Sequence, residues 1–121
     1  MGYIIKSDSD SGLYTPILDN PTDCVTAIQL QGAIYTRNGN VVNVVIAGLI
    51  DINTTIDNNG IFNFTLPFAT LSTEIYGGLF FGIDHNINGI IIGTPSVSIN
   101  TNNIIINESF KFTLNCTYFI Q

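Results

Sequence analysis

The sequence predicts an all-β protein, an antiparallel jelly-roll-like β-sandwich of about eight to ten strands. Apolar and polar residues alternate with a period of two between closely spaced turn signals, which is typical of sandwiches and barrels. Apolar residues recur nowhere at helical spacing behind a capping residue. A length of 121 residues suits one domain. We therefore expect an entry segment or linker over 1–11 and one β-sandwich domain over 12–121.

The first strand of the sandwich is expected over 13–18. Pro16 places this strand at the edge of a sheet, because proline has no N–H to donate to the ladder. Pro21 and Asp23 mark the turn that follows. A longer strand is then expected over 25–36.

The strongest local signal is the hairpin around Asn38-Gly39. This dipeptide favours a type I′ turn, because both central residues of that turn take positive φ. The flanks are rich in Val, Ile, Tyr and Thr, which suit a pleated and half-buried surface. We expect the strand over 25–36 to pair through this turn with a strand over 41–51.

The middle of the chain is expected to form further short strands between turns. The predicted turns are Asn58-Asn59-Gly60, Asn88-Gly89 and residues 100–103. The predicted strands cover 61–66, 74–83, 90–93, 96–99 and 104–107.

The last strand has the most regular alternation in the chain. One row holds Phe110, Phe112, Leu114, Cys116, Tyr118 and Ile120, and the other holds Lys111, Thr113, Asn115, Thr117 and Gln121. Such alternation places the first row on the core and the second toward solvent or a polar interface. Cys116 and Cys24 allow one disulfide, but the apolar setting of Cys116 favours two buried free thiols.

Charged residues are scarce, at 10% of the chain against about 25% in typical domains. The net charge is −6, and the basic residues are Lys6, Arg37 and Lys111. Three scattered cations cannot neutralise a run of phosphates, so we expect neither nucleic-acid binding nor attraction to anionic membranes. We expect no membrane insertion, because no apolar run approaches the length of about 20 residues that a spanning helix needs.

Apolar residues make up 45% of the chain, which is difficult to reconcile with a small free monomer. An AT-rich genome explains why Ile and Asn are frequent, but it does not explain where the apolar residues are covered. We therefore expect copies of the chain to cover part of one another's surface. The surroundings of Arg37 and Lys111 are expected to be solvent or a neighbouring subunit.

Catalysis has little support in the sequence, and we expect no enzyme activity, cofactor or metal. His85 is the one histidine, and no G-x-S-x-G, H-E-x-x-H or phosphate-loop motif occurs. Residues 84–89 match the first half of a calcium loop, but Pro95 stands where that loop needs a bidentate Glu. A solvated turn is the preferred interpretation of this segment.

Three motifs follow one another along the chain. The first, G-x-Y-T-P-x-L-x-N, is formed by Gly12, Tyr14, Thr15, Pro16, Leu18 and Asn20. The second is formed by Tyr35, Arg37, Gly39, Asn40, Val42, Val44, Gly48 and Asp51, and Leu66-Pro67 follows it. The third is the closing set Phe110, Phe112, Thr113 and Tyr118. In their order and spacing they resemble a C-terminal domain of bacteriophage tail-fibre and adhesion (receptor-binding) proteins, over 12–67 and 110–120.

The resemblance implies a small β-sandwich that assembles as a homotrimer at a fibre tip or head and recognises the host surface without catalysis. The partners would be a host cell-surface glycan or protein and other virion fibre proteins. The location would be the virion, assembled in the host cytoplasm. A purely structural virion module, such as a trimerisation knob or a capsid or fibre decoration, is the alternative. An enzyme fragment acting on host polysaccharide is a third and weaker hypothesis.

Ligand contacts are expected on the loops over 52–59 and 84–89. Asn-rich loops offer both donors and acceptors, which suit sugar hydroxyls. The candidate contact residues are Asn53, Asp57, Asn58, Asp84, His85, Asn86 and Asn88.

Removal of residues 116–121 is expected to prevent folding, because it cuts away part of an apolar row that the sheet must bury. Circular dichroism and thermal unfolding of the truncated chain measure the outcome. A soluble truncated protein that melts cooperatively would contradict the prediction.

Overall fold

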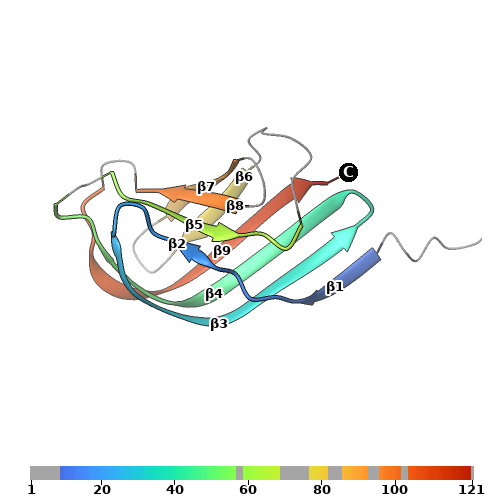
Figure 1. The fold of residues 1–121 in the computed structure, drawn as a ribbon, viewed down its shortest axis with the longest axis horizontal. Helices are drawn as coiled ribbons and strands as arrows, with labels where there is room; N and C mark the ends of the chain where they lie inside the picture. The colour runs from blue at the N-terminus through green and yellow to red at the C-terminus, as the bar shows by residue number, and fades with distance from the viewer. Residues whose placement is uncertain are drawn as a thin grey trace, which may run out of the picture.

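Nine β-strands and no helix make up the part of the chain that the structure describes (Figure 1). The structure is a computed structural model and describes residues 9–56, 59–68, 77–81, 86–92, 96–101 and 104–120. Of Ser9 and of residues 77–81 and 86–92 it describes the backbone alone. The strands are β1 (Ser9–Leu13), β2 (Leu18–Asp19), β3 (Val25–Asn38), β4 (Val41–Asn53), β5 (Ile61–Thr65), β6 (Gly77–Phe81), β7 (Asn86–Ile92), β8 (Ser96–Asn100) and β9 (Asn107–Phe119). These strands confirm the all-β prediction.

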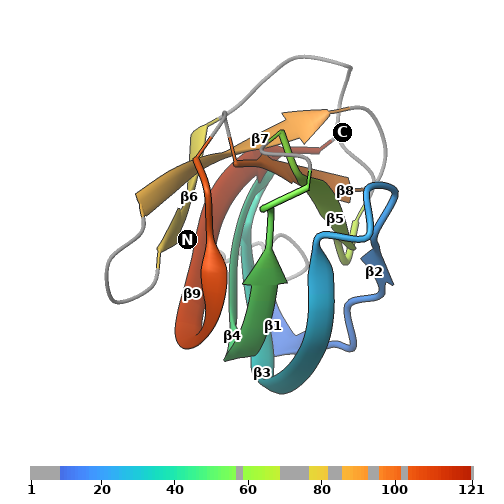
Figure 2. The same cartoon turned by 90° about the vertical axis from the view of Figure 1, so that its left-hand side faces the viewer.

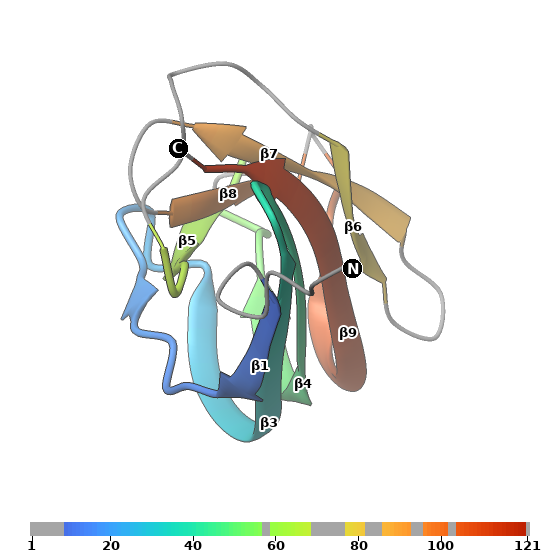
Figure 3. The same cartoon turned by 90° about the vertical axis from the view of Figure 1, so that its right-hand side faces the viewer.

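The strands form two antiparallel sheets that face each other. Their hydrogen-bonded order is β1-β3-β4-β9-β6-β7-β8-β5-β2, and all the pairs are antiparallel. The ladder folds over between β9 and β6, which pair from Gly78–Cys116 to Phe81–Thr113. Figures 2 and 3 show β3, β4 and β9 side by side in one layer, with β5, β7 and β8 across from them. The arrangement is that of a β-sandwich.

Four strands of the ladder follow a Greek-key order. β6, β7 and β8 are consecutive in the chain and pair as neighbours. β9 then returns to pair with β6, so the spatial order is β9-β6-β7-β8. This is the order of a Greek key, in which the fourth strand lies beside the first.

The segment from β1 to β2 crosses from one edge of the ladder to the other. β1 pairs with β3 and β2 pairs with β5. Ile17 N–H donates to Thr65 Oγ1 at 2.8 Å, and Ile17 C=O accepts from Thr65 N–H at 3.1 Å. The single strand expected over 13–18 is therefore wrong, because the chain changes sheets at buried Pro16, which has no N–H to pair. β1 begins at Ser9, inside the segment expected to be an entry linker; residues 1–8 lie outside the described part.

The hairpin of β3 and β4 is present, but its turn differs from the prediction. Asn38 pairs with Val41, so the central residues are Gly39 and Asn40. Gly39 has a φ of 63°, and neither Asn38 nor Asn40 has a positive φ. A positive φ at the first central position, occupied by glycine, is the pattern of a type II′ turn. The type I′ prediction is wrong because the ladder continues through Asn38.

The prediction of a turn at Asn88-Gly89 is also wrong. Both residues lie inside β7, where Gly89 pairs with Gly78 of β6 on one side and with Ile99 of β8 on the other. Pairing on both edges of the strand overrides the local preference of Asn-Gly for a turn. Residues 104–106, which were expected in a strand, precede β9 without joining a ladder.

The core lies between the two sheets, and β9 supplies its central row. The whole predicted row of β9 is buried, which confirms the alternation. Phe112 stacks on Phe64 of the opposite sheet, with ring centroids 6.0 Å apart and planes 14° apart. Cys24 and Cys116 are buried free thiols, as predicted. The core includes Val42, Val44, Ile46, Ile50 and Ile52 of β4, Phe62 and Phe64 of β5, Val97 and Ile99 of β8, the β9 row, and Cys24, Val25, Ala33, Leu66 and Ile106.

Gly48→Ala is expected to lower the free energy of unfolding by about 1–3 kcal/mol. The ladder of β3 and β4 shifts register between Leu30 and Gly32, which brings β3 backbone against Gly48. An added Cβ would overlap the Gln29 carbonyl oxygen and lie 3.1 Å from Leu30 Cα. The control is Gly32→Ala, because a Cβ at Gly32 meets no atom within 4 Å. Urea unfolding followed by circular dichroism tests both variants, and equal losses of stability would refute this account of Gly48.

Stability is expected to fall as the pH rises above about 9. Burial raises the pKa of the Cys116 thiol from 9.0 to about 12 and that of the Tyr118 hydroxyl from 10.0 to about 12. Between these values the unfolded chain releases protons that the native protein keeps, so the native state is favoured at low pH and loses that advantage as the pH rises. Burial also raises the pKa of the Tyr14 hydroxyl.

Each such group contributes a slope of about 1.4 kcal/mol per pH unit in this range. Urea unfolding at a series of alkaline pH values measures the slope. Cys116→Ala removes one titrating group and is expected to make the slope shallower. If both proteins show the same slope, the pKa of the Cys116 thiol is the same in the native and the unfolded chain, and the prediction is wrong.

Candidate functional site

The loops at one end of the sandwich are held together from inside. They are the described loops 20–24, 54–56 and 104–106, together with Gly60 and Thr101, and we call them the braced end. This end is at the left of Figure 1 and faces the viewer in Figure 2. It is formed where β3 and β5 begin, where β4 and β8 stop, and before the first residue of β9.

Two threonines provide the bracing, and they are the buried polar residues of the described chain. Thr54 Oγ1 donates to Ile104 C=O and accepts from Ile106 N–H, both at 2.8 Å. Thr101 Oγ1 accepts from Gly60 N–H at 2.8 Å. Each hydroxyl replaces the water that a loop backbone would otherwise bind. The hydroxyls thus link the described parts of these loops to one another.

Backbone hydrogen bonds complete the bracing. Thr54 N–H donates to Ile106 C=O at 2.8 Å, and Thr101 N–H donates to Gly60 C=O at 2.9 Å. Gly60 itself fits closely, because an added Cβ would lie 3.0 Å from Cys24 Sγ and from Thr54 Cγ2. Gly60 therefore packs directly against the side chains of Cys24 and Thr54.

Apolar side chains are exposed on the same loops. Ile56 is 99% exposed and Ile105 is 67% exposed, and Ile104 is also exposed. The bond from Thr54 to Ile104 brings the two loops that carry them together. Isolated exposed apolar residues are common on proteins, but these three lie on loops that are fixed from below. Exposed apolar side chains gathered on neighbouring loops make this end a candidate for an interaction site.

A hollow of about 370 Å³ lies beside Ile56. It is lined by Thr22, Asp23, Thr26, Asn53 and Ile56. Asp23 has a φ of 57°, in the left-handed region that Asp tolerates better than most residues. The turn at Asp23 is closed by its N–H, which donates to Asn20 C=O at 3.1 Å. The hollow thus combines an exposed carboxylate with hydroxyls, an amide and an aliphatic wall.

The hydroxyls and the amide of this hollow are partly engaged within the protein. Thr22 Oγ1 donates to Ile61 C=O and accepts from Ile61 N–H. Asn53 Oδ1 accepts from Thr55 N–H at 3.0 Å and from Thr55 Oγ1 at 2.6 Å. These bonds orient the Asn53 side chain and occupy its oxygen. The Asn53 amide N–H groups and the Asp23 carboxylate are groups with which the hollow can bind a ligand, and the Thr26 hydroxyl, which donates to Asp51 C=O at 3.4 Å, can still accept.

Asn53 is the predicted contact residue that the structure places in the hollow. Asn86 and Asn88 lie in β7 and not in a loop, and only their backbone is described. Asp57, Asn58, Asp84 and His85 lie outside the described residues. Sequence reasoning missed Thr22, Asp23, Thr26 and Ile56 as lining residues. The turn signal at Asp23 was visible in the sequence, but its position beside the loop after β4 was not.

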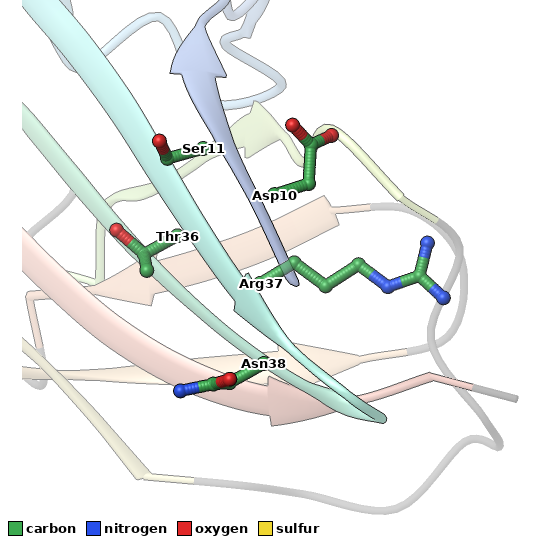
Figure 4. A pocket seen from close by; sticks show the side chains of 5 residues that line it. All are labelled: Asp10, Ser11, Thr36, Arg37 and Asn38. Carbon is green, nitrogen blue, oxygen red and sulfur yellow. The ribbon is translucent and has the colours of Figure 1, made fainter. Parts of the chain in front are cut away.

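A second hollow, of about 460 Å³, lies at the edge formed by β1 and β3. It is lined by Asp10, Ser11, Thr36, Arg37 and Asn38. Figure 4 shows Asp10 and Arg37 on one side of β1, with Ser11 and Thr36 on the other. These side chains do not converge on one point, as expected for neighbours along a strand.

The charged groups of this second hollow also have partners within the chain. Arg37 Nε donates to Gly39 C=O at 3.1 Å, and the guanidinium carbon lies 5.7 Å from the centre of the Phe68 ring. Tyr35 Oη donates to an Asp10 carboxylate oxygen at 3.0 Å, and this hydrogen bond raises the Tyr35 pKa. Half-buried Arg37 thus supports the hairpin turn and covers an aromatic ring. We take the braced end as the candidate site.

Among the described residues, no three His, Cys, Asp or Glu side chains lie close enough together to hold a metal ion. The described strands and loops include no helix long and apolar enough to cross a membrane. Comparison with known proteins finds no family model, no curated protein and no solved structure that matches the chain. The resemblance to tail-fibre domains therefore stays a prediction.

Thr54→Val is expected to lower the free energy of unfolding by about 1–3 kcal/mol, because it leaves the buried Ile106 N–H and the partly buried Ile104 C=O without their partner. Valine has nearly the shape of threonine, so the loss of stability measures the contribution of the Thr54 hydroxyl. The control is Thr15→Val, because Thr15 is exposed. Chemical denaturation of the two variants measures the difference. A loss at Thr54 no larger than that at Thr15 would rule out the bracing role.

Proposed function

We propose that this chain is the tip or head domain of a virion fibre and recognises a host cell-surface glycan or protein, as a homotrimer and without catalysis. The observation that carries the proposal is the braced end. Ile56, Ile104 and Ile105 are exposed there on loops that Thr54 and Thr101 fix from inside. Connecting loops held on a rigid scaffold are where binding residues are most often found.

The braced end suits recognition for an energetic reason. A ligand that binds loops already in place does not have to offset the entropy of ordering them. The hollow offers the Asp23 carboxylate as an acceptor and the Asn53 amide N–H groups as donors. Sugar hydroxyls both donate and accept hydrogen bonds, and Ile56 would cover the C–H face of a sugar ring.

The remaining parts of the proposal have separate support. The order β9-β6-β7-β8 is one Greek key, and a jelly roll is built from two; it supports a jelly-roll type of sandwich. A charged fraction of 10% with 45% apolar residues supports assembly into a homotrimer. The virion location and the contact with other fibre proteins are supported by the resemblance of residues 12–67 and 110–120 to tail-fibre domains.

The second candidate function is a purely structural virion module that trimerises or decorates a fibre or capsid without receptor binding. Exposed Leu13 and Ile34 favour it, because they lie on a sheet and not on the loops of the braced end. Under this hypothesis the apolar surface serves assembly alone.

Binding of the fluorescently labelled protein to a panel of bacterial cells, measured by flow cytometry, tests the proposal. Asp23→Ala and Ile56→Ser are expected to reduce binding about tenfold each, as for the loss of a buried contact of about 1.4 kcal/mol. The control is Ile17→Ser. Ile17 is exposed, and its N–H donates a hydrogen bond to Thr65 at the end of β5, whereas Gly60 of the braced end precedes the start of β5.

Three other results would each change the conclusion. A folded trimer that binds no cell of the panel favours the structural module. Equal loss of binding in the control variant would move the site away from the braced end. Release of reducing ends or acetate from bacterial polysaccharide, abolished by His85→Ala, would favour an enzyme.

A further inference from the structure

The sheet made of β1, β3, β4 and β9 has an outer face, formed by the side chains that alternate with the buried row. An apolar row crosses this face from the edge inward. Leu13 pairs with Ile34, and Ile34 pairs with Val45. Leu13 is 79% exposed and Ile34 is 51% exposed. Val41 and Phe119 form a second exposed apolar pair on the same face.

Polar side chains on the outer face bind one another. Asn43 Nδ2 donates to Asn115 Oδ1 and to Thr117 Oγ1, both at 3.0 Å. These three residues come from the adjacent strands β4 and β9. Covering a polar group costs less when its hydrogen bonds are already made within the protein. The polar part of the face can therefore be buried together with its apolar row.

The charges on the described part of the outer face cancel, although the chain carries a net charge of −6. The described charged residues of this face are Asp51 of β4 and Lys111 of β9, whose strands pair with each other. One carboxylate and one ammonium cancel. Two copies can approach through this face without the repulsion that the rest of an acidic chain would cause. The Lys111 of one copy can also lie against the Asp51 of its neighbour.

A hollow lies on the same face. It has a volume of about 220 Å³, and its lining includes Ala27, Leu49 and Asp51. The apolar row of Leu13, Ile34 and Val45 lies on another part of the face. A row on one copy that enters a hollow on the next makes a head-to-tail contact, and such contacts close into rings when the rotation allows it.

We propose that the outer face of the β1-β3-β4-β9 sheet is the interface through which copies of this chain associate in solution. The inference rests on the proposed function only for the number of copies. It assigns assembly to the sheet face, and it leaves the braced end free for the host. The two surfaces are distinct, because one consists of strand side chains and the other of loops.

Sedimentation velocity of the full chain tests this assignment. The wild-type protein is expected to sediment with the mass of three chains, and Ile34→Glu with the mass of one, because a carboxylate in the contact would be buried without a partner. Ile105→Glu is the matched control, since it makes the same change at a similarly exposed isoleucine of the braced end. It is expected to keep the wild-type mass.

Several outcomes would overturn the assignment. They are a wild-type protein that sediments as one chain at micromolar concentration, an Ile34→Glu variant that is folded and keeps the wild-type mass, and an Ile105→Glu variant that loses it. If circular dichroism shows that Ile34→Glu does not fold, Leu13→Glu on the edge strand β1 replaces it, with the same expected loss of association.

Cell binding measured on the same samples separates this inference from the proposed function. Association that depends on Ile34, together with no binding to any cell of the panel, supports the interface and rejects host recognition. A wild-type protein that sediments as one chain and still binds cells rejects the interface and supports host recognition.

Discussion

The pairing of β9 with both β4 and β6 is the constraint on which the rest of the structure depends. β9 pairs with β4 from Val41–Phe119 to Asn53–Asn107, and with β6 through Cys116 to Thr113. It is therefore the strand through which the hydrogen-bonded ladder passes from one sheet to the other. Its buried row fills the space between the sheets, where Phe112 stacks on Phe64. A single strand, β9, thus both connects the two sheets and, through its alternating buried side chains, fills the core between them.

Once the sheets face each other, their ends and edges have to be closed. The segment around Pro16 connects the two edge strands β1 and β2 and is held to β5 by the bond of Ile17 N–H to Thr65 Oγ1 and by the Tyr14 hydroxyl, which donates to the Thr65 C=O at 3.2 Å. At the braced end, Thr54 and Thr101 satisfy loop backbone groups that would otherwise be buried without partners. No buried side-chain nitrogen or oxygen lacks a partner among the described residues. The same closure that stabilises the sandwich fixes the loops proposed to meet the host.

The apolar residues of the described chain lie mainly in the core. The exposed ones lie on the outer face of the β1-β3-β4-β9 sheet, on the braced end, and at Ile17 between β1 and β2. The sets on the sheet face and on the braced end differ in their surroundings: the described charges of the sheet face, Asp51 and Lys111, have opposite signs, whereas the described lining of the hollow beside Ile56 has the Asp23 carboxylate and no cation. This difference is the basis for assigning association to the face and recognition to the end.

The sequence by itself determined the elements whose side chains face one environment. The row from Phe110 to Ile120, the existence of the β3–β4 hairpin and the burial of both thiols follow from alternation and residue type. Such signals are local, because each residue of a strand reports the face on which it lies.

Only the tertiary structure decided the features that depend on a partner distant in the chain. Gly89 became a strand residue because β6 and β8 pair on either side of it, and the turn moved to Gly39-Asn40 because the ladder runs on through Asn38. The hollow joins Asp23 to Ile56 across the whole of β3 and β4. Asp23 and Ile56 lie close together because of long-range strand pairing and packing, which no local pattern of residues encodes.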